Sequence, residues 1–530
     1  MSLSVLRATK ARWRKTHDAR AEKWHMTEGG LDLGKDRIIK AIAVYVPGSI
    51  VPAAISFASI SVFTRLVSPS GYGRYSLVIN AAGLIILLST QWIEQAVQRY
   101  LPVAGDAQSR NELRVACVAA VAIVIAILLI VGVVALPLFI RRGPNAIGSL
   151  LLPAVIYVIF SCIYNMEAAV MRAMIDAKSY VIFKSMFAAI QFGAKAALLL
   201  MVLKGDPSAL VWGSAIATGL LLPFMWRNIR IPNIRSLVRG FFRTTTHLVR
   251  DFAIYGIPLT GWYVASMLLS VGDRYVIQLF LGDRIVGIYS ANYQLIEGLS
   301  NILFAPFLLA IHPYMIGYWR RHSREETGLL LGQIQELLLV AGIVGCGLAW
   351  VFAEHMSSLL GVTYGEGYVI LPWVFAGVFL WNLGLMAHKP LEFEKKTLAM
   401  MAYAMGCAIL NLALNFIAVP ILGYKGAAYS TFISYLGYVI VVGIKGKNIL
   451  NWRLPHRWWT MIVAVMTIAE FLVVKKVAVD VGGTHGYGAR TAVEIIGAVI
   501  ATISVVVITL RRHPGALRFL KELGPNKRSV

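Results

Sequence analysis

The chain has 530 residues, of which 58% are hydrophobic and only 14% are charged, and its mean hydropathy is +0.69. A water-soluble protein of this length needs more polar surface, so the composition excludes the soluble classes and indicates a membrane protein. The net charge of +24 would suit nucleic acid or anionic lipid, and the positions of the basic residues decide between them.

Long apolar runs with few or no charges recur along the whole chain. A helix needs about 20 apolar residues to cross ~30 Å of hydrocarbon. The runs therefore predict an all-α polytopic membrane protein with about 14 transmembrane helices. The predicted spans are 41–64, 75–98, 115–140, 146–171, 179–203, 207–226, 252–279, 288–316, 328–353, 367–388, 397–421, 425–444, 457–474 and 490–510.

The basic residues fall mainly on one side of these spans. Most of the 50 Lys and Arg residues lie in alternate connections that share a side with both termini. Connections rich in Lys and Arg stay in the cytoplasm, so we expect cytoplasmic N- and C-termini and an even number of spans. This distribution accounts for most of the net charge, and we expect no nucleic-acid partner.

Residues 1–36 are polar and basic, with no apolar core typical of a cleavable signal peptide. Trp13 and Trp24 lie among the basic residues of this arm. The pattern favours contact with anionic membrane lipids, and docking to a partner protein is the alternative.

Motifs of metal sites and enzymes are missing from the sequence. Its four cysteines lie singly in apolar runs, without a CxxC pair, so we expect no metal site and no disulfide framework. No HExxH, GxSxG or P-loop pattern occurs. We therefore expect neither enzymatic activity nor a cofactor.

Two segments repeat a short pattern. "RLVSPSGYGRYSL" (65–77) and "LFLGDRIVGIYSA" (279–291) share a glycine, a tyrosine and a serine at equal spacing, and each closes the first span of a six-span block. Two six-helix halves of equal orientation are a transporter layout with a central cavity. The predicted organisation is a cytoplasmic arm (1–36), an N-terminal half (37–228), a basic cytoplasmic linker (229–250), a C-terminal half (251–446), two additional helices (447–510) and a basic cytoplasmic tail (511–530).

Charged residues occur inside the spans, where they usually face a cavity or a partner. Asp273 and Arg274 are neighbours, and adjacent residues on a helix point in different directions. We therefore expect each of them to need another helix, water or a ligand. Lys195 lies near the middle of its span, one turn from Gln191, and the favoured interpretation is a cation facing the cavity. Structural pairing remains the alternative for all three charged residues.

Polar residues also form stripes along three predicted helices. Such stripes can hold helices together, and a shared aqueous cavity would explain all of them at once. The candidate residues in the stripes are Gln91, Glu94, Gln95 and Gln98, then Gln294, Glu297 and Asn301, then Asn411 and Asn415.

Three segments resemble the Wzx-type polysaccharide flippases of the MOP superfamily, whose relatives include the MATE antiporters and lipid II flippases. The segments are "FTRLVSPSGYGRYSLVINAAGLIILL" (63–88), "YGIPLTGWYVASMLLSVGDRYVIQLFLGDRIVGIYSANYQL" (255–295) and "MRAMIDAKSY" (171–180). The resemblance covers the twelve-span body. "QWIEQA" (91–96) departs from it, because many relatives have a small, glycine-containing segment there.

The resemblance implies a function in the bacterial cytoplasmic (inner) membrane. Such proteins move undecaprenyl-diphosphate-linked oligosaccharides to the outer leaflet for surface polysaccharide synthesis, alongside a polymerase and chain-length or export proteins. It makes Lys195, Arg274 and Arg65 the candidate diphosphate contacts. It makes Asp273, Glu297 and Glu94 the candidate carboxylates for coupling to H⁺ or Na⁺. The cavity-lining polar candidates are Gln191, Gln91, Asn301, Asn411 and Asn415.

Other functions remain open from the sequence. A MATE-like exporter of cationic drugs or metabolites is the main rival, and a mid-membrane lysine argues against it. A lipid II flippase fits the motifs less well. A membrane enzyme of polysaccharide assembly, such as a polymerase, is the alternative of another class, but the sequence has no large outer loop for one.

Overall fold

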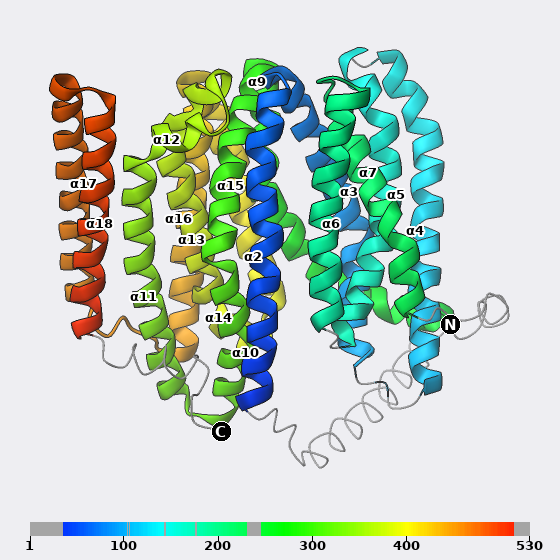
Figure 1. Ribbon diagram of the computed structural model, residues 1–530. Coiled ribbons are helices and arrows are strands. Elements are labelled where there is room, and N and C mark those ends of the chain that lie inside the picture. The colour runs from blue at the N-terminus through cyan, green and yellow to red at the C-terminus, as the bar shows by residue number, and fades with distance from the viewer. Residues whose placement is uncertain are drawn as a thin grey trace, which may run out of the picture.

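Helices make up nearly all of the described chain (Figure 1). The computed structural model describes residues 35–512, except 103, 105–106, 143–144, 175–176 and 230–244. Almost all of the predicted basic arm and tail, and most of the predicted linker, therefore lie outside the described residues. Within the described ranges there is no strand, which confirms the all-α class.

The N-terminal half consists of six long helices, one of which ends in a π-helical turn. They are α2 (Lys35–Leu66), α3 (Pro69–Tyr100), α4 (Ala107–Arg142), α5 (Asn145–Ala173), α6 (Ala177–Ala197) continued by η1 (Leu198–Val202), and α7 (Ser208–Ile229). We call the end of the molecule where α2 begins the proximal end. The distal end is the one where α2 ends and α3 begins.

The C-terminal half begins with a single long helix and is followed by a separate hairpin. Its helices are α9 (Thr245–Leu303), α10 (Ala305–Arg321), α11 (Arg324–Val351), α12 (Ala353–Ser358), η2 (Val362–Ile370), α13 (Leu371–Ala387), α14 (Lys389–Phe393), α15 (Thr397–Leu422) and α16 (Tyr424–Leu450). The hairpin consists of α17 (Arg457–His485) and α18 (Tyr487–Arg512).

Among the described residues, eleven helices are long and apolar enough to cross a membrane. One of them, α9, contains the predicted span 252–279 and most of the span 288–316. The connection expected between them is missing, because the chain leaves helical geometry only at Gly282, with φ 78°. Glycine adopts this left-handed conformation at little cost. If α9 is counted as two helices, the eleven become twelve. The helices α2 and α17 lie at two further predicted positions, which gives the fourteen spans expected.

The two halves cross at the distal end through the repeated pattern. A Cβ at Gly73 would overlap the carbonyl oxygen of Asp283 and lie 2.9 Å from the nitrogen of Gly287. A Cβ at Gly287 would in turn overlap the carbonyl oxygen of Pro69. The equivalent glycines of the repeat thus bring the two backbones into direct contact, and we call this contact the glycine crossing.

Two hydrogen bonds connect the halves to one another near the glycine crossing. The Tyr72 hydroxyl donates to Oε1 of Gln294 at 2.8 Å, and the Tyr364 hydroxyl donates to the Val67 carbonyl at 2.8 Å. The second bond places η2 at the distal end. The helix α13, which follows η2 directly, therefore runs from the distal to the proximal end.

The α17–α18 hairpin lies at one edge of the molecule, beside α11 (Figure 1). A cluster of charged side chains fastens it to α12. Arg490 of α18 lies 2.7 Å from Glu354 and 3.2 Å from Glu494, and Lys475 of α17 lies 3.5 Å from Glu494. The two additional helices are thus attached to the C-terminal half, outside the twelve-helix body.

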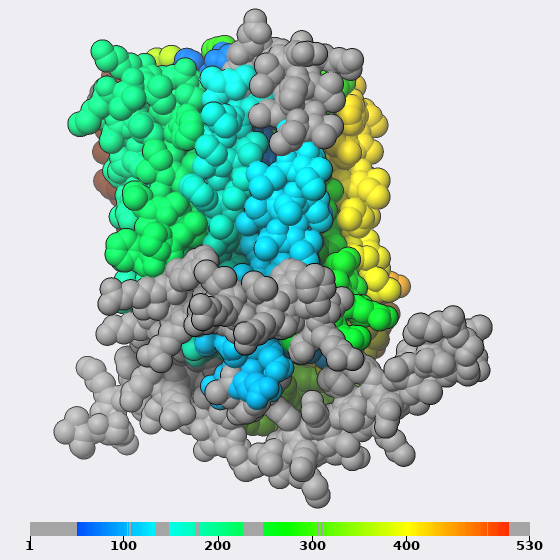
Figure 2. All heavy atoms as spheres, turned by 90° about the vertical axis from the view of Figure 1, so that its right-hand side faces the viewer, coloured from blue at the N-terminus to red at the C-terminus, as the bar shows by residue number. Residues whose placement is uncertain are grey.

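The outer surface of the helix bundle is apolar. Figure 2 shows the face of the N-terminal half on which α4 lies, in light blue. Large aliphatic side chains of α4 point outward there, including Ile127, Ile130 and Val131, which are 53%, 67% and 55% exposed. Such a surface suits lipid tails rather than water, so the molecule is a multi-pass membrane protein.

Candidate functional site

Three neighbouring cavities lie among the helices of the bundle. The distal cavity, of about 250 Å³, is lined from α2, α3, α6 and α9. The middle cavity, of about 420 Å³, shares Glu297 and Asn301 with it. The proximal cavity, of about 550 Å³, shares Leu308 and Leu385 with the middle one. Together they form a series that begins near the glycine crossing.

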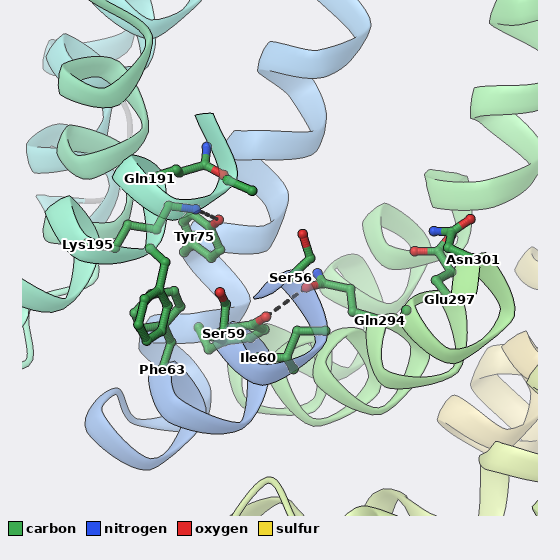
Figure 3. Close-up of a pocket in the computed structure, with 14 residues that line it drawn as sticks. Ser56, Ser59, Ile60, Phe63, Tyr75, Gln191, Lys195, Gln294, Glu297 and Asn301 are labelled. Carbon is green, nitrogen blue, oxygen red and sulfur yellow. Dashed lines mark hydrogen bonds between the residues drawn. The ribbon is translucent and has the colours of Figure 1, made fainter. Parts of the chain in front are cut away.

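The distal cavity is lined mainly by polar side chains (Figure 3). Lys195 and Gln191 extend into it from α6, and Glu297 and Asn301 extend into it from α9 on the opposite side. The remaining polar lining residues are Ser56, Ser59, Tyr72, Tyr75 and Gln294. The cavity therefore lies between the two halves, as the repeat predicts. Its lining provides both hydrogen-bond donors and hydrogen-bond acceptors.

Lys195 is the cation of the distal cavity. Its side chain is buried, its Nζ donates to the Tyr75 hydroxyl at 3.1 Å, and it lies 5.9 Å from the centre of the Phe63 ring. Gly213 of α7 makes room for its stem, since a Cβ there would lie 2.6 Å from Cγ of Lys195. Among the described residues no carboxylate pairs with Lys195, so its charge is available to an anion.

The middle cavity has a carboxylate surrounded by aromatic rings. Glu297 accepts a hydrogen bond from the Ser270 hydroxyl at 3.3 Å. Tyr293, Trp381 and Tyr435 line the same cavity. Aromatic faces combined with a few polar groups are typical of carbohydrate sites and of organic-cation sites alike.

The proximal cavity contains a cluster of titratable side chains. Lys389 is 4% exposed, lies 2.5 Å from Glu392 and bonds to Nδ1 of His312. His388 bonds to the Tyr438 hydroxyl at 2.9 Å. The sequence places "HKPLEFEKK" at the end of a span, where a lysine is expected in solvent. Its burial comes from α14, a short helix that turns Lys389 back into the cavity.

Asp273 and Arg274 lie outside the linings of these three cavities. Both are buried, at 0% and 1% exposed, and the Asp273 carboxylate lies 3.4 Å from the Arg274 guanidinium. The two neighbours therefore do contact one another, although their side chains leave the helix in different directions. The guanidinium folds back along its own helix and also bonds to the Ser270 carbonyl.

Each member of this pair has a second contact on the segment of α9 that follows Gly282. The Tyr289 hydroxyl donates to Asp273 at 2.5 Å, and the Arg274 guanidinium lies 4.5 Å from the centre of the Tyr293 ring. Tyr293 lines the middle cavity, so Arg274 lies one side chain behind it. The pair connects the two segments of α9 and supports the cavity wall from behind.

The remaining candidates also lie away from the three cavities. Glu94 pairs with Arg172 at 2.8 Å and bonds to Thr90, and Arg65 is exposed at the distal end of α2. Asn411 and Asn415 are buried and bonded to one another at 3.0 Å. Gln91 is half-buried on α3. Of the eleven candidates, the structure brings together Lys195, Gln191, Glu297 and Asn301.

The sequence analysis missed a buried carboxylate of the N-terminal half. Glu167 of α5 is 0% exposed, and neither of its oxygens has a hydrogen-bond partner among the described residues. Glu167 lies in an apolar run of the sequence, and its charge is the only feature there that could have marked it as a candidate.

Replacement by leucine should change the free energy of unfolding in opposite directions at Glu167 and at Glu94. We expect Glu167→Leu to raise the free energy of unfolding by about 1–3 kcal/mol, because it removes a buried polar group without a partner. Glu94→Leu should lower it, because it removes the 2.8 Å ion pair with Arg172. Thermal unfolding in detergent measures both. A loss of stability in Glu167→Leu would mean that the carboxyl group has a stabilising contact.

The sequence matches a family model described as "Polysaccharide biosynthesis protein" over residues 38–319. This match covers more than half of the chain. The protein belongs to this family. No curated protein shows significant similarity to the sequence.

Solved structures of transporters share the fold. A lipid II flippase, MurJ, in an inward closed conformation has a TM-score of 0.66 and 10% identity, covering 89% of this chain and 98% of its own. A multidrug resistance MATE family transporter of the MOP superfamily, in an inward-facing conformation, has a TM-score of 0.59 and 12% identity, covering 77% of this chain and 98% of its own. These similarities show that the chain has the same fold as these transporters.

Proposed function

We propose that this polysaccharide biosynthesis protein moves an undecaprenyl-diphosphate-linked oligosaccharide from the cytoplasmic to the outer leaflet of the bacterial inner membrane. One observation supports this most strongly. In a protein of this family, a mainly polar cavity lies between the two halves, and its lysine, Lys195, pairs with no carboxylate among the described residues.

The orientation of the proposal follows from the charges. Among the described residues, most Lys and Arg residues lie at the proximal ends of the helices, and such ends face the cytoplasm. The glycine crossing then closes the outer end of the cavity series. The oligosaccharide would enter from the proximal side and leave after the distal contacts separate.

The physical obstacle to this movement is desolvation. Sugar hydroxyls and a diphosphate lose their water if they enter hydrocarbon, which costs several kcal/mol for each unsatisfied group. Gln191, Gln294 and Asn301 can replace water around hydroxyls, and the rings of the middle cavity can stack on sugar faces. Lys195 can form charge-assisted hydrogen bonds to a phosphate oxygen.

Alternating access follows from the arrangement of the contacts. The halves meet at the distal end through the glycine crossing, two hydrogen bonds and a buried apolar cluster that includes Val67, Ile288 and Leu295. Separation of these contacts would open the distal cavity to the outer side. Glu297, at the junction of the distal and middle cavities, is our candidate for coupling this step to H⁺ or Na⁺.

A MATE-like cation antiporter is the second candidate. Glu297 among Tyr293, Trp381 and Tyr435 would suit an organic cation. Lys195 argues against this candidate. This lysine pairs with no carboxylate among the described residues, so its positive charge would repel a cationic substrate from the distal cavity of about 250 Å³.

Deletion of the gene, followed by mass spectrometry of extracted lipids, tests the proposal. We expect complete lipid-linked repeat units to accumulate on the cytoplasmic side and surface polymer to be lost. Unchanged lipids with altered sensitivity to cationic drugs would favour the antiporter. Repeat units that reach the outer leaflet without being polymerised would instead indicate a polymerase, the partner that we otherwise expect to act next.

A further inference from the structure

The segment between α16 and α17 encloses a fourth cavity, separate from the three described above. It has a volume of about 880 Å³ and lies at the proximal end of the α17–α18 hairpin. Its lining combines basic and aromatic side chains. The residues are Lys447, Trp452, Arg453, Leu454, Pro455, His456, Arg457, Trp458, Trp459 and Ile462. We call it the linker cavity.

The backbone of the linker cavity is fixed onto α11. Gly328 and Gly332 admit it closely, because a Cβ at Gly328 would lie 2.7 Å from the Leu450 carbonyl oxygen and one at Gly332 would overlap that of Arg453. One turn further, Glu336 accepts a hydrogen bond from the backbone nitrogen of His456 at 3.2 Å. Three residues at a spacing of four thus hold the segment in one conformation.

The basic side chains of the linker cavity are available to a ligand. Lys447, Arg453 and Arg457 are exposed, and none of them pairs with a carboxylate in the part of the chain that the structure describes. The Arg457 guanidinium lies 5.3 Å from the centre of the Trp458 ring. Nε1 of Trp452 is buried without a hydrogen-bond acceptor among the described residues. The cavity therefore offers positive charge and an unused N–H donor, which suit a phosphate group.

An apolar surface continues from the cavity along α17. Ile462 lines the cavity and is 49% exposed, and Met461 and Val465 beside it are 58% and 67% exposed. Trp458 is 67% exposed at the level of the basic residues, where tryptophan is enriched at membrane interfaces. The surface thus passes from cationic to aromatic to aliphatic, in the order of a phospholipid from head to tail.

We propose that the linker cavity binds an anionic phospholipid of the cytoplasmic leaflet. Arg453, Arg457 and Lys447 hold the head-group phosphate, the Trp452 N–H donates to it, and the acyl chains lie along α17. This lipid occupies the outside of the hairpin and is not transported, so the site is independent of the oligosaccharide route. Anionic lipids are attracted to clustered Lys and Arg at this level of the membrane.

Native mass spectrometry of the full-length protein tests this site. The probes are phosphatidylglycerol, phosphatidylcholine and undecaprenyl diphosphate, each added to the delipidated protein. We expect Arg453→Gln with Arg457→Gln to weaken phosphatidylglycerol binding about tenfold and phosphatidylcholine binding little, because two charge-assisted contacts are lost. Trp452→Phe, which keeps the ring packing, should weaken phosphatidylglycerol binding about fivefold.

The matched control is Arg320→Gln with Arg321→Gln, which removes two exposed arginines at the same end of the molecule. We expect it to leave phosphatidylglycerol binding within about twofold. Equal losses in both double variants would mean that only the overall surface charge attracts the lipid, and the proposal would fail. It would also fail if undecaprenyl diphosphate displaced phosphatidylglycerol from the protein at equimolar amounts, because the cavity would then be a substrate site.

Discussion

Lys195→Met is expected to reduce transport of the lipid-linked oligosaccharide by about 10- to 100-fold, with normal protein levels. The substitution keeps the length of the stem beside Gly213 and removes the charge. A charge-assisted hydrogen bond to phosphate contributes about 1.5–3 kcal/mol, and each 1.4 kcal/mol corresponds to about tenfold in binding. The readout is surface polymer together with accumulated lipid-linked repeat units.

Lys184→Met is the matched control for this prediction. Lys184 lies on the same helix, α6, but is exposed and does not line the distal cavity. We expect this variant to transport normally. Unfolding temperatures of both variants should stay near that of the unmodified protein, because neither lysine has a carboxylate partner among the described residues. Normal transport in Lys195→Met would remove this lysine from the proposed route.

Gly287→Ala is expected to cause the largest loss of stability among single-methyl additions to the distal end. Its Cβ would overlap the Pro69 carbonyl oxygen and lie 3.0 Å from the nitrogen of Gly73. Backbone atoms cannot move aside as a side-chain tip can, so we expect a loss of about 3 kcal/mol or more. The temperature of thermal unfolding and the amount of surface polymer should both fall.

Gly272→Ala provides the comparison, because nothing lies within 4 Å of a Cβ at that position. Alanine favours a helix over glycine by about 1 kcal/mol, so this variant should be as stable as the unmodified protein or more so. If Gly287→Ala unfolded at the same temperature as Gly272→Ala, the glycine crossing would not be a close contact in the folded protein.

The fold could be predicted from the sequence because its determinants are local. Apolar runs of spanning length mark the helices, and the repeated glycine, tyrosine and serine mark the equivalent ends of the two halves. The shape of α9 was harder to predict. "GDRIVG" (282–287) contains charged residues typical of a connection, yet only Gly282 leaves helical geometry.

The site could be predicted only in part, because burial and pairing depend on side-chain direction. Lys195 reaches the distal cavity as its mid-span position suggests. Arg274 has an equally strong charge signal, but its guanidinium folds onto Asp273 and its own helix. Lys389 carried the opposite signal, since it sits at a span boundary but is buried by the short helix α14.

Flipping by the purified protein in proteoliposomes tests the central claim most directly. The lipid-linked oligosaccharide is placed in both leaflets, and a membrane-impermeant enzyme that cleaves the glycan reports the fraction that becomes accessible over time. We predict that the unmodified protein makes nearly all of the substrate accessible and that Lys195→Met falls close to protein-free vesicles. If the unmodified protein left the inner-leaflet fraction protected, or if both proteins flipped equally well, the proposed route through the distal cavity would be contradicted.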